Sequence, residues 1–339
     1  MHRELPLFVH TQSGSSLVLH SLLAGALMFV VDAGLASAAD QPSATQTGGS
    51  QATLEIPLRP KVPGRFQLSL QSRRETTKGS GEWVSRVKKV EWNTAETMII
   101  ICDMWDGHYC QLAAQRVDAM APRMNRVITA ARNHGTMVIH APSGTMKHYA
   151  QTPFRKRMQQ LPAAKPPIEL QGWCHLDSDR EAPLPVDTSK QACDDPVVGE
   201  AVRRFSKQHA AIKIIGYDGI SDNGQEIYNF IHIGKIKNVV LMGVHTNMCV
   251  LGRPFGIRQM ARLGLNVVLA RDLTDAMYDP REFPYVSHTR GTELVVEHIE
   301  KYWCPSILGD DLTKVVPGSA DPTAEVAKRD VQPVTDAKP

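Results

Sequence analysis

Between residues 97 and 305, short uninterrupted apolar runs alternate with longer segments of helical periodicity. Apolar runs without alternation are typical of strands that are buried on both faces of a parallel sheet. These runs predict strands at Met98–Cys102, Met137–His140, Ala211–Ile215, Val239–Gly243 and Val267–Ala270. The periodic segments predict helices at Gln111–Asn133, Asp222–Ile233, Val250–Leu263 and Gly291–Trp303. The alternation predicts an α/β fold, a doubly wound and mainly parallel sheet with helices on both faces.

The segments that flank this α/β region have a different texture. Residues 53–96 alternate apolar and polar positions in patches separated by Pro and Gly, which predicts a small N-terminal β extension of short strands. Residues 40–52 are small and polar and predict a flexible linker. Residues 306–339 are rich in Asp, Pro, Ala and Lys, a composition typical of a disordered tail.

One long excursion, residues 142–210, interrupts the α/β alternation and contains several prolines. A segment of this kind inside a compact domain is either a functional loop, such as a lid, or a plain surface insertion. Cys174 and Cys193 both lie in it and could form a disulfide in an exported protein.

Residues 1–39 contain an apolar run, Ser16–Leu35, that ends in small residues, as in a secretory signal peptide. We therefore expect export to the periplasm or the extracellular space. The alternative is a start codon further downstream and a cytoplasmic protein. Asp32 shortens the clean apolar run below the roughly 18 residues of a permanent span, so no stable membrane span is expected after processing.

Charge and cysteine content narrow the function classes. The chain has 38 basic and 35 acidic side chains, a formal net charge of +3, and the basic residues are scattered. A nucleic-acid partner is not expected, because its binding face would need clustered positive charge. Six cysteines are too few for a disulfide scaffold in 339 residues, so each cysteine is judged by its position.

Three reactive side chains end or flank predicted strands, where open α/β sheets gather their active groups. Asp103 ends the run Met98–Cys102, Lys213 lies within the run Ala211–Ile215, and Cys249 follows the run Val239–Gly243. Amides at the start of the following helix favour a thiolate at Cys249, so this residue is a candidate nucleophile. Taken singly, the three residues also fit a structural cysteine, a turn aspartate and a solvated lysine.

The string from Val240 to Val250, with Cys249 after a Gly-Val-His-Thr-Asn-Met turn, resembles the isochorismatase-like cysteine hydrolase superfamily, which includes nicotinamidase and N-carbamoylsarcosine amidase. The resemblance implies a catalytic set of Asp103, Lys213 and Cys249. The neighbours of Lys213 lack the aromatic-serine motif of many members, so Lys235 and Lys237 are alternatives.

The resemblance also implies a cis peptide bond between Val244 and His245 and an oxyanion hole made of the backbone N–H groups of His245 and Cys249. Side chains that could line the substrate pocket are Trp105, Asp106, His245 and Thr246. Pro254 lies inside the predicted helix after Cys249, so this helix either starts late or bends at Arg253.

The implied activity is hydrolysis of an amide or amide-like C–N bond in a small molecule, through a thioester on Cys249. Two alternatives are an isochorismatase-type vinyl ether hydrolase, which needs the acid but not the thiol, and a non-catalytic binding protein of the same fold. No cofactor and no metal are expected. Three scattered histidines are weak candidate ligands, namely His108, His140 and His148. A homo-oligomer is possible, but the sequence does not decide this.

Overall fold

The computed structural model describes residues 59–60 and 64–317. The predicted signal peptide (1–39) and linker (40–52) lie outside the described residues. Within the part that is described, no helix combines the length and apolar character needed to cross a membrane.

The core is a mainly parallel sheet whose central strands are nearly fully buried, which confirms the predicted fold class. Its strand order is β2-β1-β8-β7-β6-β3-β4-β5, with β9 paired to β1. The parallel strands are β3 (Thr97–Cys102), β4 (Met137–Ala141), β5 (Gly219–Ile220), β6 (Asn238–Val244), β7 (Asn266–Asp275) and β8 (Ser306–Ile307).

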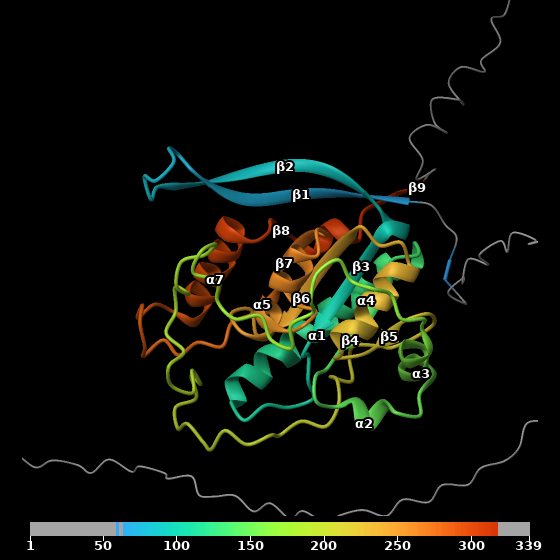
Figure 1. Cartoon of the computed structure of the whole chain (residues 1–339). Helices are drawn as coiled ribbons and strands as arrows, with labels where there is room; N and C mark the ends of the chain where they lie inside the picture. Colours follow the sequence, from blue (N-terminus) through green and yellow to red (C-terminus); the bar gives the residue numbers. More distant parts are fainter. Residues whose placement is uncertain (1–58, 61–63, 318–339) are drawn as a thin grey trace, which may run out of the picture. The chain divides into compact units, whose positions relative to one another are not determined.

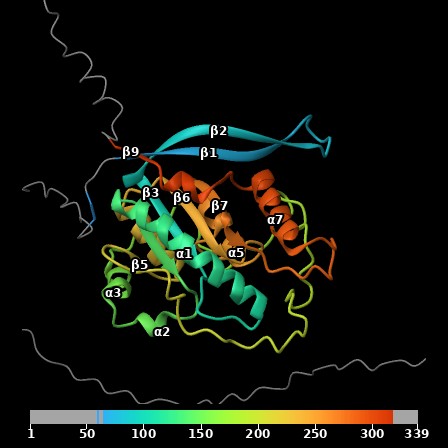
Figure 2. The ribbon, with the colours of Figure 1, turned by 180° about the vertical axis from the view of Figure 1, so that it is seen from behind.

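Successive side chains of β3 pack into two separate hydrophobic cores, one on each face of the sheet, because side chains alternate across a strand. Met98 and Ile100 pack with α4 (Gly224–Ile233), α6 (Ile257–Arg262) and α7 (His288–Tyr302). Ile99 and Ile101 pack with α1 (Gln111–Asn133) on the other face. Figures 1 and 2 show these two sides, with α1 in front of the sheet in Figure 2. The helices on both faces explain why the strands read as continuous apolar runs.

Two predicted elements are wrong. The run Ala211–Ile215 forms a loop, with Ile215 47% exposed, and the short strand β5 lies further along at Gly219–Ile220. The helix predicted at Val250–Leu263 is broken into α5 (Cys249–Gly252) and α6, since Pro254 lies between them. The excursion contains two short helices, α2 (Met146–Tyr149) and α3 (Pro153–Gln160), and little other regular structure.

A long hairpin extends the sheet at one edge (Figure 1). Its strands are β1 (Gly64–Glu75) and β2 (Trp83–Asn93), followed by the short 3₁₀ helix η1 (Thr94–Glu96). β1 meets β8 and β9 (Val315–Pro317), and η2 (Gly309–Leu312) lies between these two strands in the chain. The prediction of a disordered tail from residue 306 is therefore wrong for 306–317, and residues 318–339 lie outside the described residues.

Candidate functional site

The candidate site lies where the winding of the sheet changes direction. From β3 the chain continues outward through β4 and β5, whereas β6, β7 and β8 lie on the other side of β3. Asp103 follows β3 and Cys249 follows the adjacent parallel strand β6. Both residues thus lie at the carboxyl ends of neighbouring strands, at the topological switch point where α/β folds bind ligands.

Asp103 is fully buried and tightly fixed. Its backbone adopts φ +48°, a left-handed conformation that Asp tolerates better than most residues. The backbone N–H of Asp103 donates to Ala141 O at 3.1 Å, and Oδ1 accepts the backbone N–H of Ser143 at 2.7 Å. The end of β4 and the first residues of the excursion therefore set the position of the carboxylate.

The cation that pairs with Asp103 is Arg253. Both Nε and Nη2 of Arg253 lie 3.0 Å from Asp103 Oδ2. Arg253 ends α5 in an extended conformation, with ψ 156°. A residue before proline is disfavoured in the helical region, so Pro254 stops the helix at this point and leaves the guanidinium directed at the carboxylate. Sequence reasoning missed this role, although it identified the Arg253-Pro254 break.

The prediction that Lys213 supplies this cation is wrong. Lys213 is exposed on the loop that replaces the predicted third strand. Its Nζ donates to Ala210 O at 2.9 Å, and its backbone N–H donates to Asn125 Oδ1 at 2.9 Å. The alternatives Lys235 and Lys237 precede β6, at the end of that strand opposite to the candidate site.

The turn that carries Cys249 is clamped by the end of β7. The backbone N–H of Thr246 donates to Asp275 O at 2.9 Å. The side chain of Asn247 donates to Met277 O at 2.8 Å and accepts the Met277 N–H at 2.9 Å. Cys249 is half-buried and begins α5.

The Val244–His245 peptide bond is cis, at the position that the sequence indicated. The preceding residue, Gly243, has φ +106°, and a Cβ at this position would lie 2.0 Å from the carbonyl oxygen of Cys102, so only glycine fits. The backbone N–H of His245 lies in the turn between β6 and Cys249. Among the described residues, neither this N–H nor that of Cys249 donates to a backbone carbonyl.

The protonation of the site differs from the sequence expectation. Burial and the charge of Asp103 raise the pKa of the Cys249 thiol far above its ordinary value, although Arg253 opposes the shift. Burial also raises the pKa of Asp103, while Arg253 and the Ser143 N–H oppose that shift. The raised pKa of Cys249 favours a neutral thiol at rest, not the thiolate expected at a helix start. The sulfur becomes nucleophilic when Asp103 takes its proton.

Two of the four predicted pocket residues line a cavity. Trp105 and His245 surround a cavity of about 10 Å³, the size of one water molecule, together with His108 and three residues of α1. His245 is 4% exposed, and its Nε2 has no hydrogen-bond partner among the described residues. Burial, with His108 nearby, lowers the pKa of His245 to about 3, so this imidazole is neutral.

The other two predicted pocket residues have structural roles instead. Asp106 accepts hydrogen bonds from the N–H and hydroxyl of Ser206 and from the N–H of Lys207, which fastens the returning end of the excursion. Thr246 is fully buried, and its hydroxyl bonds that of Thr274 at 2.7 Å.

The excursion covers α5, a feature that the sequence did not reveal. The N–H of Cys174 donates to Gly252 O at 2.7 Å. A Cβ on Gly252 would lie 2.7 Å from the ring of Trp173, so this helix residue must be small. The Arg253 guanidinium lies 5.6 Å from the centroid of the same Trp173 ring, within cation–π range. Trp173 thus packs against the cation that holds Asp103.

The three candidate metal histidines do not converge. His140 is buried between Asp218 and Gln208, with both ring nitrogens at 3.0 Å from their partners. His148 is exposed, and Nδ1 of His108 accepts the N–H of Cys110. Cys174 and Cys193 contact different partners, Gln259 and Cys110, so the suggested disulfide between them is not formed.

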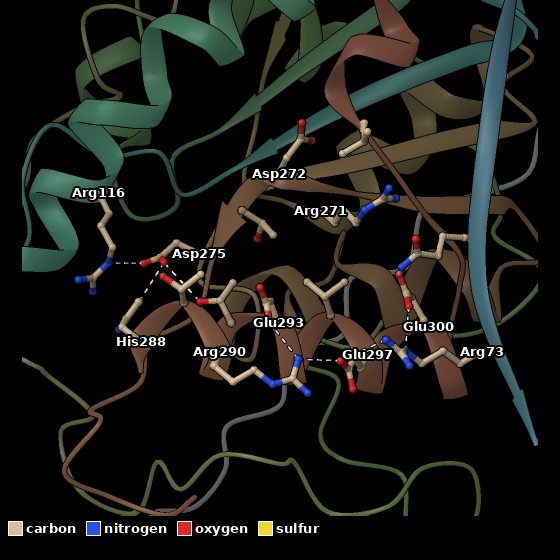
Figure 3. A pocket seen from close by; sticks show the side chains of 16 residues that line it. Arg73, Arg116, Arg271, Asp272, Asp275, His288, Arg290, Glu293, Glu297 and Glu300 are labelled. Carbon is tan, nitrogen blue, oxygen red and sulfur yellow. Dashed lines mark hydrogen bonds and ion pairs between the residues drawn. The ribbon is translucent and has the colours of Figure 1, made fainter. Parts of the chain in front are cut away.

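A larger hollow of about 570 Å³ lies between β1, β7 and α7 (Figure 3). Most of its charged side chains pair with one another, and Asp275 lies between Arg116 and His288 at 2.9 Å from each. Asp103, Arg253 and Cys249 do not line it. Its ion pairs therefore support the fold behind the Cys249 turn and are separate from the candidate site.

An acid, a cation and a thiol at the carboxyl ends of adjacent parallel strands define an α/β protein with a candidate nucleophilic site. A sequence model of the isochorismatase domain matches residues 97–283, more than half of the chain, so the chain belongs to the isochorismatase family.

Solved structures resemble the chain at low identity. A cysteine hydrolase from Pseudomonas syringae pv. phaseolicola 1448A is 14% identical and the match covers 66% of this chain and 92% of that one, with a TM-score of 0.40. An N-carbamoylsarcosine amidase from Thermoplasma acidophilum is 13% identical. That match covers 55% of this chain and 87% of that one, with a TM-score of 0.31. No curated protein matches the chain significantly.

Proposed function

We propose that the protein is a cysteine hydrolase that cleaves an amide or amide-like C–N bond of a small molecule. The observation that carries the proposal is that Asp103 and Cys249 follow the adjacent parallel strands β3 and β6, and that Arg253 holds the Asp103 carboxylate. A nucleophile, its base and a group that orients the base are the parts required for covalent catalysis.

The proposed reaction begins when the Cys249 sulfur bonds to the substrate carbonyl carbon and its proton passes to Asp103. The carbonyl oxygen becomes an oxyanion, which the backbone N–H groups of His245 and Cys249 stabilise. The C–N bond then breaks, Asp103 returns the proton to the leaving nitrogen, and a thioester remains on Cys249. Water attacks the thioester with Asp103 as base, and the carboxylic acid leaves as the thiol regains its proton.

Arg253 takes the part that the family resemblance had assigned to Lys213. A guanidinium remains charged at every relevant pH, so it favours the ionised form of a buried carboxylate that desolvation would otherwise protonate. It also offers planar N–H donors that fix the orientation of the carboxylate. Asp103 is therefore available as a base in spite of its complete burial.

The test is release of ammonia or amine from a panel of small primary and secondary amides. We expect Cys249→Ala to abolish release, while Cys304→Ala, which changes a buried cysteine elsewhere, keeps it. Acid quenching of the wild type should trap an acyl group on the peptide that contains Cys249. Turnover of a vinyl ether that survives Cys249→Ala would favour the isochorismatase-type alternative, and no turnover at all would favour a binding protein.

A further inference from the structure

Two cysteines that the proposed reaction does not use lie together at the start of α1. Cys110 precedes this helix, and Cys193 reaches it from the excursion, 83 positions later in the chain. Their sulfur atoms and a carboxylate oxygen of Asp195 all lie within 4.8 Å of one another. The three residues are 0%, 1% and 6% exposed, so the cluster is closed to solvent.

The separations within this cluster fit a shared metal ion. Cys110 Sγ lies 3.5 Å from Asp195 Oδ1. Around tetrahedral zinc, with Zn–S near 2.3 Å and Zn–O near 2.0 Å, sulfur and oxygen ligands are about 3.5 Å apart. We propose that Cys110, Cys193 and Asp195 bind one zinc-like divalent ion, which joins the excursion to the start of α1.

The charged neighbours of the two adjacent aspartates differ. Asp194 is neutralised by Arg116 at 2.8 Å and by His288 at 3.3 Å. No ion pair formed by the described residues includes Asp195, whose oxygens accept only the backbone N–H groups of Gln111 and Leu112 besides the thiol contact. A divalent ion would supply the charge that Asp195 lacks, and these two N–H groups would orient its carboxylate toward the metal.

Asp194 is a poor fourth ligand, although its Oδ1 also lies 3.5 Å from Cys110 Sγ. Both of its oxygens are already engaged by Arg116. Water is the simplest fourth ligand. Thiolate donors favour zinc over magnesium or calcium, which prefer oxygen ligands. The proposal replaces the sequence expectation of no metal and uses none of the three histidines considered there.

The proposed ion would also support the segment around His108, which lies next to the candidate site. Nδ1 of His108 accepts the N–H of Cys110 at 3.2 Å, and the His108 ring meets His245 edge-on at 5.0 Å between centroids. A metal at Cys110 would therefore hold the segment that forms one wall of the small cavity. Its role is structural, and it takes part in no step of the proposed hydrolysis.

The test uses the full chain, stripped with a chelator under a reducing agent and then titrated with Zn²⁺ or Co²⁺. We expect one ion per chain by elemental analysis and, with Co²⁺, the intense near-ultraviolet absorption of thiolate–cobalt charge transfer. Cys193→Ser should abolish this absorption, and Asp195→Asn should weaken binding at least tenfold. Cys174→Ser, which changes a buried cysteine of the same excursion, should change neither.

Three outcomes would overturn the proposal. They are a wild-type chain that binds no ion at micromolar Zn²⁺ with all thiols free, a Cys110–Cys193 disulfide in the untreated protein, and unchanged binding in Cys193→Ser. The cobalt spectrum of the wild type decides the matter by itself if a variant does not fold. None of these measurements depends on hydrolytic activity, so failure here and failure of the proposed function are distinguishable.

Discussion

Arg253 and Asp103 form a partly buried ion pair, and the cation directly follows the short helix that begins with the candidate nucleophile. Two guanidinium nitrogens lie 3.0 Å from Asp103 Oδ2, and Arg253 is four residues after Cys249. One turn of helix thus supplies both the thiol and the group that keeps its base ionised. A shift of this turn would displace both groups together.

Replacement of Arg253 should impair the base. We expect Arg253→Gln to lower kcat/KM about 100-fold to 1,000-fold near neutral pH, because the buried Asp103 carboxylate loses its counter-charge. The acid limb of the pH–rate profile should also move to higher pH, since the cation is what opposes the rise in the pKa of Asp103 caused by burial. The measurement is kcat/KM against pH on the best amide of the panel.

Arg253→Lys and Lys213→Ala are the matched controls. The lysine variant keeps a charge but loses the paired donors, so we expect an intermediate rate. Lys213 is exposed and bonded to Ala210 O, so its removal should leave the profile unchanged. A large loss of kcat/KM in Lys213→Ala, with a normal value in Arg253→Gln, would mean that Lys213 is the cation that supports Asp103.

Asp103→Asn should affect hydrolysis and alkylation in opposite directions. Without the base, hydrolysis should fall by about 1,000-fold or more. The pKa of Cys249 is raised by burial and by the charge of Asp103, and Arg253 opposes both. Loss of the carboxylate leaves the thiol beside an unpaired guanidinium, so the thiolate fraction should rise and iodoacetamide should label Cys249 faster than in the wild type.

Labelling is measured by peptide mass spectrometry over a pH series, with Cys249 compared with the buried Cys304 in the same sample. Slow labelling of the wild type at neutral pH is expected, because its resting form is a thiol. Rapid wild-type labelling that Asp103→Asn abolishes would mean that the pair rests as a thiolate and a carboxylic acid.

Part of the candidate site could be predicted from the sequence, because the positions of Asp103 and Cys249 depend on where neighbouring strands end. Asp103 and Cys249 end or follow apolar runs that form neighbouring buried strands, and such runs identify strand ends directly. The cis bond between Val244 and His245 was implied by the family resemblance of the turn after β6. These features require no knowledge of how distant segments meet.

The errors arose where local pattern and tertiary contacts disagree. The run Ala211–Ile215 has the apolar content of a strand, but Lys213 N–H is bonded to Asn125 on α1 and Ile215 faces solvent, so no strand forms. The role of Arg253 depends on where the chain goes after Pro254, and the contact of Cys193 with Cys110 spans most of the excursion. Neither course of the chain can be deduced from the local periodicity of apolar residues.

Pro254→Ala tests whether the break in the helix positions the cation. Alanine removes the restriction on Arg253, so α5 and α6 can extend toward each other and the guanidinium can leave Asp103. We expect kcat to fall about 10-fold to 100-fold, with an acid limb displaced in the same direction as in Arg253→Gln. Pro162→Ala, at an exposed position of the excursion, is the control and should behave as the wild type. Unchanged kcat in Pro254→Ala would show that other contacts position Arg253.

The ion pairs behind the Cys249 turn predict a pH-dependent stability. Although burial opposes it, hydrogen bonds to Asp194 and Asp275 raise the pKa of His288 to about 9. Figure 3 shows the contact with Asp275. The unfolded value is about 6.5, so the contribution of charged His288 is complete below that pH and is lost as the pH rises through about 9.

His288→Gln should therefore lower the free energy of unfolding by about 2 kcal/mol at pH 6, and the loss should shrink steadily as the pH rises from about 6.5 to about 9. Urea denaturation of both proteins between pH 6 and 10 measures the difference. His148→Gln changes an exposed histidine and should stay within about 0.5 kcal/mol of the wild type throughout. A deficit in His288→Gln that does not vary across this range would mean that the imidazole stabilises the fold without its charge.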